Sequence, residues 1–154
     1  MHKKSILIKN ARIVNEGEIF EGDVLIEDQY IKEVASSISV KNSNITVIDA
    51  ENNYLIPGVI DDQVHFREPG LTHKATIETE SRAAIAGGIT SFIEMPNTNP
   101  QATTIEKLED KFQIAANTSS ANYSFMFGGT NNNLEEILKV DPLKVAGLKL
   151  FLGS

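Results

Sequence analysis

The sequence contains no cysteine, a minority of basic residues and no long hydrophobic run, and each absence narrows the possibilities. Without cysteine the protein has no disulfide, no thiolate nucleophile and no zinc site built on cysteine. The 14 Lys and Arg residues are outnumbered by 21 Asp and Glu, and the net charge of −7 argues against nonspecific binding to nucleic acid or membrane surfaces. No segment approaches the roughly 20 apolar residues that span a bilayer. The apolar run at 6–8 is too short for a signal peptide, so we predict a cytoplasmic protein.

The composition that remains is that of a globular protein. The 154 residues include 41% hydrophobic and 23% charged residues, which excludes a disordered or collagen-like chain. A chain of this length can bury one sizeable core.

The first 56 residues are predicted to form a small β-domain. Segments rich in Ile and Val alternate roughly with polar residues, which predicts strands, and clusters such as the one at 42–44 predict turns. The predicted strands are 5–9, 23–27, 30–34 and 44–48. We expect a small antiparallel sheet or half-sandwich.

From residue 57 onward, predicted strands and helices alternate. The predicted strands are one within 54–65 and those at 89–95, 123–127 and 145–152. The predicted helices are 74–86, a helix that begins with a capping box at Thr103 and Glu106, and 132–140. Five residues of the middle helix share an apolar face: Ile105, Leu108, Phe112, Ala115 and Ala116. This βαβαβαβ order predicts an α/β fold with a parallel sheet. A closed barrel of such units needs eight strands, so we expect the N-terminal part of a larger protein; a complete small open sheet is the alternative.

Polar residues alternate along and after the first strand of this second region. Asp61, Gln63, His65 and Arg67 would share one face of a strand. Buried without partners they would be costly, whereas at the carboxyl end of the strand His65 can bind a metal and Arg67 an anion. An edge strand with a solvated polar face explains the same spacing, and both interpretations stay open.

Two further motifs also have two interpretations. Asn97, which follows the next strand, can bind a carboxylate or amide, or it can belong to a simple turn. Lys149 lies in the apolar last strand, where desolvation favours a neutral amine that can react with carbon dioxide to form a metal-binding carbamate. The alternative is a lysine that protects an edge strand from association. His73 and Lys74 are interpreted as loop residues before a helix, and His2 is given no role.

Taken together, these segments resemble the dihydroorotases of the amidohydrolase superfamily. The resemblance is carried by 55–61, by Val64-His65-Phe66-Arg67-Glu68-Pro69-Gly70, and by Thr72-His73-Lys74, Ala86-Gly87-Gly88-Ile89-Thr90, Met95-Pro96-Asn97-Thr98 and Gly147-Leu148-Lys149-Leu150. It implies that 57–154 is the first half of a metal-dependent TIM (β/α)8 barrel, truncated after barrel strand 4. It implies that 1–56 belongs to a composite β-sandwich. The implied activity is the reversible cyclisation of N-carbamoyl-L-aspartate to L-dihydroorotate in pyrimidine synthesis, by a homo-oligomer.

The resemblance also implies residue roles. His65 would bind zinc, Arg67 and Asn97 would bind the substrate carboxylate, and Lys149 would be a carboxylated lysine bridging two zinc ions. The family usually has histidine where this chain has Gln63, a poorer zinc ligand, so one or two ions are expected. The catalytic Asp is expected beyond residue 154, so this stretch is predicted to be inactive alone. The alternatives are a hydantoinase or allantoinase, and a non-catalytic dihydroorotase-like subunit that supports aspartate transcarbamoylase.

Overall fold

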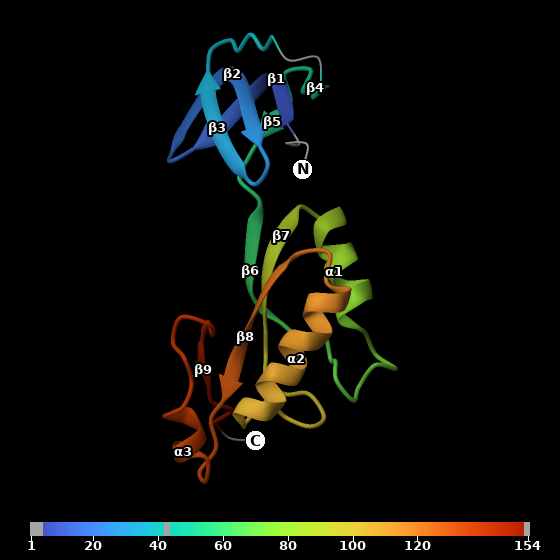
Figure 1. The fold of residues 1–154 in the computed structure, drawn as a ribbon, viewed down its shortest axis with the longest axis vertical. Coiled ribbons are helices and arrows are strands. Elements are labelled where there is room, and N and C mark those ends of the chain that lie inside the picture. Colours follow the sequence, from blue (N-terminus) through green and yellow to red (C-terminus); the bar gives the residue numbers. More distant parts are fainter. Residues whose placement is uncertain (1–4, 42–43, 153–154) are drawn as a thin grey trace. The chain divides into compact units, whose positions relative to one another are not determined.

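The computed structural model describes residues 5–41 and 44–152. The chain divides into two compact units, the first ending at Pro57 and the second beginning at Gly58 (Figure 1). His2 and residues 42 and 43 of the predicted turn cluster lie outside the described residues. Among the helices that are described, none has the length and apolar character needed to cross a membrane.

The first unit is a mixed β-sheet. Its strands are β1 (Ser5–Asn15), β2 (Glu18–Glu27), β3 (Tyr30–Ala35), β4 (Ile45–Asp49) and β5 (Tyr54–Leu55). The order is β3-β2-β1-β4, with β5 also paired to β1. Neighbours β1–β2 and β2–β3 are antiparallel, but β4 and β5 run parallel to β1. The predicted antiparallel sheet is therefore wrong for β4, because the segment after β3 crosses to the far edge of the sheet before β4 begins, a path that alternation along single strands does not record.

A tight hairpin and one buried acid organise this unit. Glu16 and Gly17, between β1 and β2, have φ values of 50° and 84°, as the favoured two-residue hairpin turn requires. The register of β1 shifts between Ile8 and Ala11. There the Asp23 carboxylate accepts hydrogen bonds from the backbone N–H groups of Asn10 at 3.0 Å and Ile38 at 2.9 Å. Asp23 thus satisfies the backbone of an irregular strand from inside the unit.

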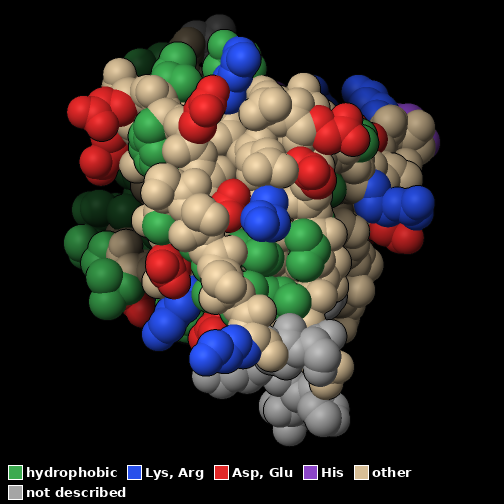
Figure 2. Space-filling view, turned by 90° about the horizontal axis from the view of Figure 1, so that it is seen from above, with side chains coloured by type: hydrophobic (Ala, Val, Ile, Leu, Met, Phe, Trp, Pro, Cys, Tyr) green, Lys and Arg blue, Asp and Glu red, His purple; other side chains and the backbone are tan. Residues whose placement is uncertain are grey.

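The first unit has a buried cluster on each face of its sheet and also leaves apolar side chains exposed. Its buried residues include Leu7, Leu25 and Ile38 in one cluster and Ala11, Ile13 and Val24 in another. Tyr30 and Ile31 are 67% and 70% exposed. Figure 2 shows hydrophobic side chains on the molecular surface, interspersed with acidic and basic groups.

The second unit is a four-stranded parallel sheet in the order β6-β7-β8-β9, as the βαβαβαβ pattern predicts. Its elements are β6 (Val59–Val64), α1 (Ile77–Ala86), β7 (Ile89–Glu94), α2 (Ile105–Thr118), β8 (Asn122–Gly128), α3 (Leu134–Ile137) and β9 (Gly147–Lys149). Helices α1 and α2 pack against each other and against β7 and β8 (Figure 1). The core between them is rich in aromatic side chains and includes Phe66, Ile77, Phe92, Leu108, Phe125 and Phe127.

The helix starts differ from those predicted. Thr104, not Thr103, is the N-cap of α2, and its hydroxyl accepts from the Lys107 N–H. The capping box belongs to α1, where Thr76 and Thr79 bond reciprocally.

At the N-terminus of both helices, a backbone N–H donates to a carboxylate from another segment. Glu68 Oε2 accepts from the Ile77 N–H at 2.7 Å, and Glu136 Oε2 accepts from the Ile105 N–H at 2.9 Å. Negative charge at a helix N-terminus is favourable, so these contacts tie the segments after β6 and β8 to the helices.

The last two elements are shorter than predicted. Helix α3 has four residues and β9 has three, against predictions of 132–140 and 145–152. Leu148 and Leu150 are 48% and 51% exposed, so the strand is not covered on both faces. Within the described residues β9 pairs only with β8.

Candidate functional site

The polar residues singled out in the sequence gather at the carboxyl edge of the parallel sheet. His65 and Arg67 follow β6, Asn97 follows β7, and Lys149 ends β9. In parallel sheets this edge carries binding and catalytic groups on the loops that leave the strands.

The alternation expected from Asp61 to Arg67 is interrupted. Strand β6 ends at Val64, and its pairing with β7 shifts register between Asp61 and Val64. Only Asp61 and Gln63 lie on the strand. His65 and Arg67 belong to the segment beyond it, which is anchored by the buried Phe66 ring, 4.5 Å from the ring of Phe92.

His65 and Asn97 meet across the two segments. The distance from His65 Nδ1 to Asn97 Oδ1 is 2.9 Å. An amide oxygen can only accept, so Nδ1 carries the hydrogen in this contact, and the tautomer it selects in a neutral ring has its lone pair on Nε2. The same bond leaves both N–H groups of the Asn97 amide as donors for a ligand.

Gln63 and Lys149 form a second pair. Lys149 Nζ donates to Gln63 Oε1 at 3.1 Å and lies 5.6 Å from the centre of the Phe151 ring. Strands β6 and β9 are the two ends of the sheet order, about 14 Å apart in a flat sheet at ~4.8 Å per step. This hydrogen bond joins the two ends of the sheet order, as a sheet that curls about its strand direction allows.

Backbone geometry locks the segments after β6 and β7 together. Arg67, which is half-buried, has a φ of 68°, and its carbonyl accepts from the Leu71 N–H at 3.0 Å. Gly70 has a φ of 81°, and a Cβ there would lie 1.8 Å from the Asn99 carbonyl oxygen, so only glycine fits. The Asn99 N–H donates to the Pro69 carbonyl at 3.1 Å.

A buried ion pair beneath this edge escaped the sequence analysis. Glu94 Oε2 lies 2.5 Å from Lys111 Nζ, and both residues are fully buried. Burial is the main cause of two pKa shifts: the pKa of Glu94 is raised and that of Lys111 is lowered. A signal existed, because Lys111 falls between Leu108 and Ala115 on the apolar face of the predicted helix.

A hollow of about 560 Å³ opens beside Asn97. It is lined by Asn97, Gln101, Gly129, Thr130, Asn131, Leu150, Phe151 and Leu152. The lining combines amide and hydroxyl groups with apolar side chains, as sites for small polar molecules do. No sequence motif distinguished Gln101, Thr130 and Asn131 from ordinary loop residues.

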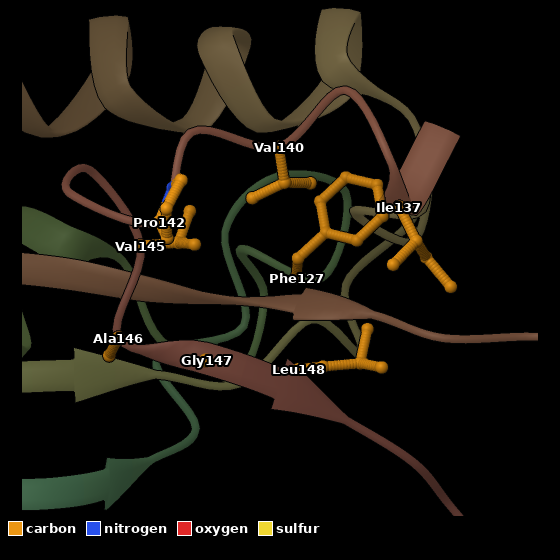
Figure 3. A pocket seen from close by; sticks show the side chains of 8 residues that line it. All are labelled: Phe127, Ile137, Val140, Pro142, Val145, Ala146, Gly147 and Leu148. Atoms are coloured by element: carbon orange, nitrogen blue, oxygen red, sulfur yellow. The ribbon is translucent and has the colours of Figure 1, made fainter. Parts of the chain in front are cut away.

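A second hollow of about 300 Å³ lies under α3 (Figure 3). Its lining residues, among them Phe127, Ile137, Val140 and Leu148, include no titratable side chain. It has the groups to bind an apolar surface but none to perform acid–base chemistry.

The donor set fits a zinc ion only in part. Within residues 5–41 and 44–152, no cluster of three or more His, Asp or Glu side chains could hold a metal. His65 fits, since metal-binding histidines usually donate their other ring N–H to an oxygen, as Nδ1 does to Asn97. A lysine amine is not a usual zinc ligand, so Lys149, whose Nζ donates to Gln63 Oε1, fits only as a carbamate. His73 and Lys74 are exposed in the turn before α1, as expected for loop residues.

Comparison with known proteins identifies relatives over most of the chain. A family model described as dihydro-orotase-like matches residues 52–153. Two curated proteins named Dihydroorotase, from Staphylococcus epidermidis and Staphylococcus aureus, are 42% and 43% identical over 113 and 103 residues, which are 73% and 67% of this chain. The matched regions are 27% and 24% of those proteins, so the chain spans about a quarter of their length.

Solved structures confirm the fold. The L-hydantoinase from Arthrobacter aurescens superimposes with a TM-score of 0.87 and 31% identity, over 93% of this chain and 32% of that one. A D-hydantoinase gives 0.77 with 28% identity, over 94% and 32%. These hydantoinases are TIM-barrel amidohydrolases, so the curled sheet corresponds to the N-terminal part of such a barrel, as the sequence predicts.

Proposed function

The chain belongs to the dihydro-orotase-like family of the amidohydrolase superfamily, and from that membership we propose that the whole protein is a dihydroorotase. It interconverts N-carbamoyl-L-aspartate and L-dihydroorotate in pyrimidine synthesis. Relatives named for dihydroorotase and for hydantoinase both support a cyclic amidohydrolase. The observation that carries the narrower proposal is the junction of the segments after β6 and β7, which brings Arg67 and Asn97 to one edge of the sheet.

Arg67 and Asn97 bind the substrate carboxylate in this proposal. The guanidinium presents paired N–H donors that match a carboxylate. The Asn97 amide adds N–H donors, because its oxygen is already engaged by His65. Neither group touches the scissile amide; both fix the orientation of the ring against His65.

His65, through Nε2, and Lys149, as a carboxylated lysine, are proposed to hold one or two zinc ions, with Gln63 as a weak ligand. Support comes from the orientation that Asn97 gives to His65. A bound zinc ion would polarise the amide carbonyl of the substrate as a Lewis acid. The catalytic Asp is still predicted to lie beyond residue 154.

The test is a comparison of cyclic amides with and without a carboxylate. We expect the whole protein to open dihydroorotate and to close N-carbamoyl-aspartate. Its kcat/KM for dihydroorotate should exceed that for hydantoin or allantoin by about 100-fold or more, because a site built to bind a charged group discriminates against ligands that lack it. Equal or better turnover of hydantoin would contradict the proposal and favour a hydantoinase.

One observation favours a second candidate, a non-catalytic subunit that supports aspartate transcarbamoylase. Lys149 Nζ donates to Gln63 Oε1 at 3.1 Å, so the residue beside the proposed carbamate is an amide, a poorer zinc ligand than imidazole. This candidate predicts no turnover of dihydroorotate at any zinc concentration, together with a stable complex with aspartate transcarbamoylase in sedimentation.

A further inference from the structure

The loop that follows β8, residues 129–133, is held by the side chain of Asn133. Its Nδ2 donates to the carbonyl oxygens of Gly128 at 2.8 Å and Thr103 at 2.9 Å, and its Oδ1 accepts from the Thr130 N–H at 2.8 Å. A carboxamide has two N–H donors and one oxygen, so every polar atom of the side chain is engaged. The partners also fix which atom is the nitrogen, because two carbonyl oxygens need donors and one N–H needs an acceptor.

This role differs from the usual one of an asparagine at the start of a helix. Asn133 is the N-cap of α3, where an asparagine side chain ordinarily accepts from the backbone of the helix that follows. Here the side chain makes no such bond, and the backbone carbonyl of Asn133 accepts from the N–H groups of Glu136 and Ile137. The side-chain bonds instead go back to the end of β8, to the loop and, across 30 residues, to the segment after β7.

The end of β8 packs closely on the segment after β7. The Gly128 N–H donates to the Ala102 carbonyl at 2.8 Å, and a Cβ on Gly128 would lie 3.1 Å from the Cβ of Pro96. On the other side of the loop, the Gly129 N–H donates to the Lys149 carbonyl at 2.9 Å. The loop after β8 therefore lies between the segment after β7 and the end of β9.

This placement brings Thr130 and Asn131 into the wall of the hollow beside Asn97. Both residues are exposed, and exposed loop residues with few packing contacts are easily displaced unless hydrogen bonds hold them. A hydroxyl and a carboxamide can each donate and accept, which matches the neighbouring N–H and C=O groups of a cyclic amide.

We propose that Asn133 is a positioning residue that holds the loop after β8, so that Thr130 and Asn131 bind the ring of a cyclic amide beside Asn97. The segment after β7 is the fixed partner, because its contacts with the segment after β6 already hold it. That the ligand is a cyclic amide rests on the proposed function, whereas the positioning of the loop is a property of the free protein.

The experiment compares Asn133→Ala with the matched control Asn132→Ala in the whole protein. Asn132 is exposed, and its backbone N–H, which alanine retains, donates to Thr130 Oγ1 at 3.3 Å. Hydrogen exchange by mass spectrometry is followed in peptides covering 128–132, the loop, and 134–140, which contains α3. This measurement needs no substrate.

We expect exchange in 128–132 to be faster by about 10-fold in Asn133→Ala, the size expected from the loss of one hydrogen bond. Exchange in 134–140 should stay at the parental rate, because the backbone carbonyl of residue 133 is retained. Asn132→Ala should match the parental protein in both peptides. Parental exchange in 128–132 for Asn133→Ala would overturn the inference. Faster exchange in 134–140 would also overturn it, because it would indicate a helix-capping role.

Kinetics with the cyclic amide that the parental protein turns over best test the link to binding. Asn133→Ala should raise KM by about 10-fold and change kcat by less than about 2-fold, because contacts with the ring are made before and during the reaction alike. The same substitution should leave KM unchanged in a Thr130→Ala/Asn131→Ala background, since the effects of residues that act through one another are not additive. An equal rise in KM in both backgrounds would overturn the inference.

These outcomes are separate from those of the proposed function. Turnover of hydantoin in place of dihydroorotate would contradict the dihydroorotase proposal but leave this test intact, because the test uses whichever cyclic amide is turned over. Faster exchange in 128–132 with parental exchange in 134–140 supports the positioning role whatever the activity.

Discussion

Asp23 in the first unit and Glu94 in the second are both buried acids, but they meet different partners. Asp23 accepts two backbone hydrogen bonds, from Asn10 and Ile38, and its pKa is lowered mainly by the bond from Ile38. Glu94 meets the ammonium group of Lys111, and its pKa is raised by burial. The first unit thus uses a buried charge to complete its own backbone, whereas the second holds one beneath the edge that carries the candidate site.

The comparison extends to the polar groups left at the surface. In the second unit the exposed side chains of His65 and Gln63 are hydrogen-bonded to residues of other segments, Asn97 and Lys149. Variants of Asp23 should therefore alter stability alone. Variants at the sheet edge should alter activity alone, and variants of the ion pair should alter both.

The largest effect is expected from breaking the ion pair on one side only. Lys111→Met leaves the Glu94 carboxylate buried without its counter-ion, which should reduce the free energy of unfolding by about 3–5 kcal/mol. Urea denaturation of the whole protein measures this. Glu94→Gln/Lys111→Met is the control and should recover most of the loss; a single variant as stable as the parent would show that the pair is not electrostatically coupled.

Asp23→Asn should have the next largest effect, and the effect should depend on pH. The variant points an amide N–H₂ at a backbone donor, which should cost about 1.5–3 kcal/mol at neutral pH. Because the folded pKa of Asp23 is lowered from 3.8, its stabilising contribution is complete above that value and is lost as the pH falls through the folded pKa. Parent and variant should therefore converge in unfolding free energy below about pH 3.8; a constant difference down to low pH would contradict the assignment.

Arg67→Met should separate activity from stability. If Arg67 binds the substrate carboxylate, kcat/KM for dihydroorotate should fall by about 10- to 150-fold, corresponding to about 1.5–3 kcal/mol. The unfolding free energy should change by less than about 0.5 kcal/mol, as for a surface substitution. Asn97→Ala serves as the matched variant on the neighbouring segment. Unchanged kinetics in both would remove the carboxylate-binding assignment.

The smallest effect is expected from Gln63→His. An imidazole is a better zinc ligand than an amide, and the exchange also releases Lys149 from its bond with Gln63. Zinc content measured after identical purification should be higher in the variant than in the parent. Gln63→Asn is the control, and equal zinc in all three proteins would show that residue 63 does not limit binding.

The sequence predicted the second unit better than the first because periodicity reports local structure and not strand pairing. Alternating strands and helices with short connections leave few arrangements open, and the parallel order followed. In the first unit the same apolar alternation is compatible with either direction for β4. Pairing of His65 with Asn97 depends on two strand ends 32 residues apart in the chain meeting at one edge, which spacing alone cannot specify.

The buried pair was missed for a different reason. Glu94 is the last residue of a strand that also contains Thr90 and Ser91, and Lys111 interrupts an apolar helix face. Each residue alone resembles a tolerated exception at a surface. Only the structure brings the two residues, from different elements, into contact as an ion pair.

The contact between Gly70 and Asn99 has a consequence for engineering. A side chain at residue 70 would overlap the Asn99 carbonyl, so the segments after β6 and β7 behave as one rigid corner. Insertions or loop grafts in either segment would dislodge the other. Library design aimed at new substrates is therefore better directed to the loop after β8, where the exposed Thr130 and Asn131 face the hollow beside Asn97 without belonging to that corner.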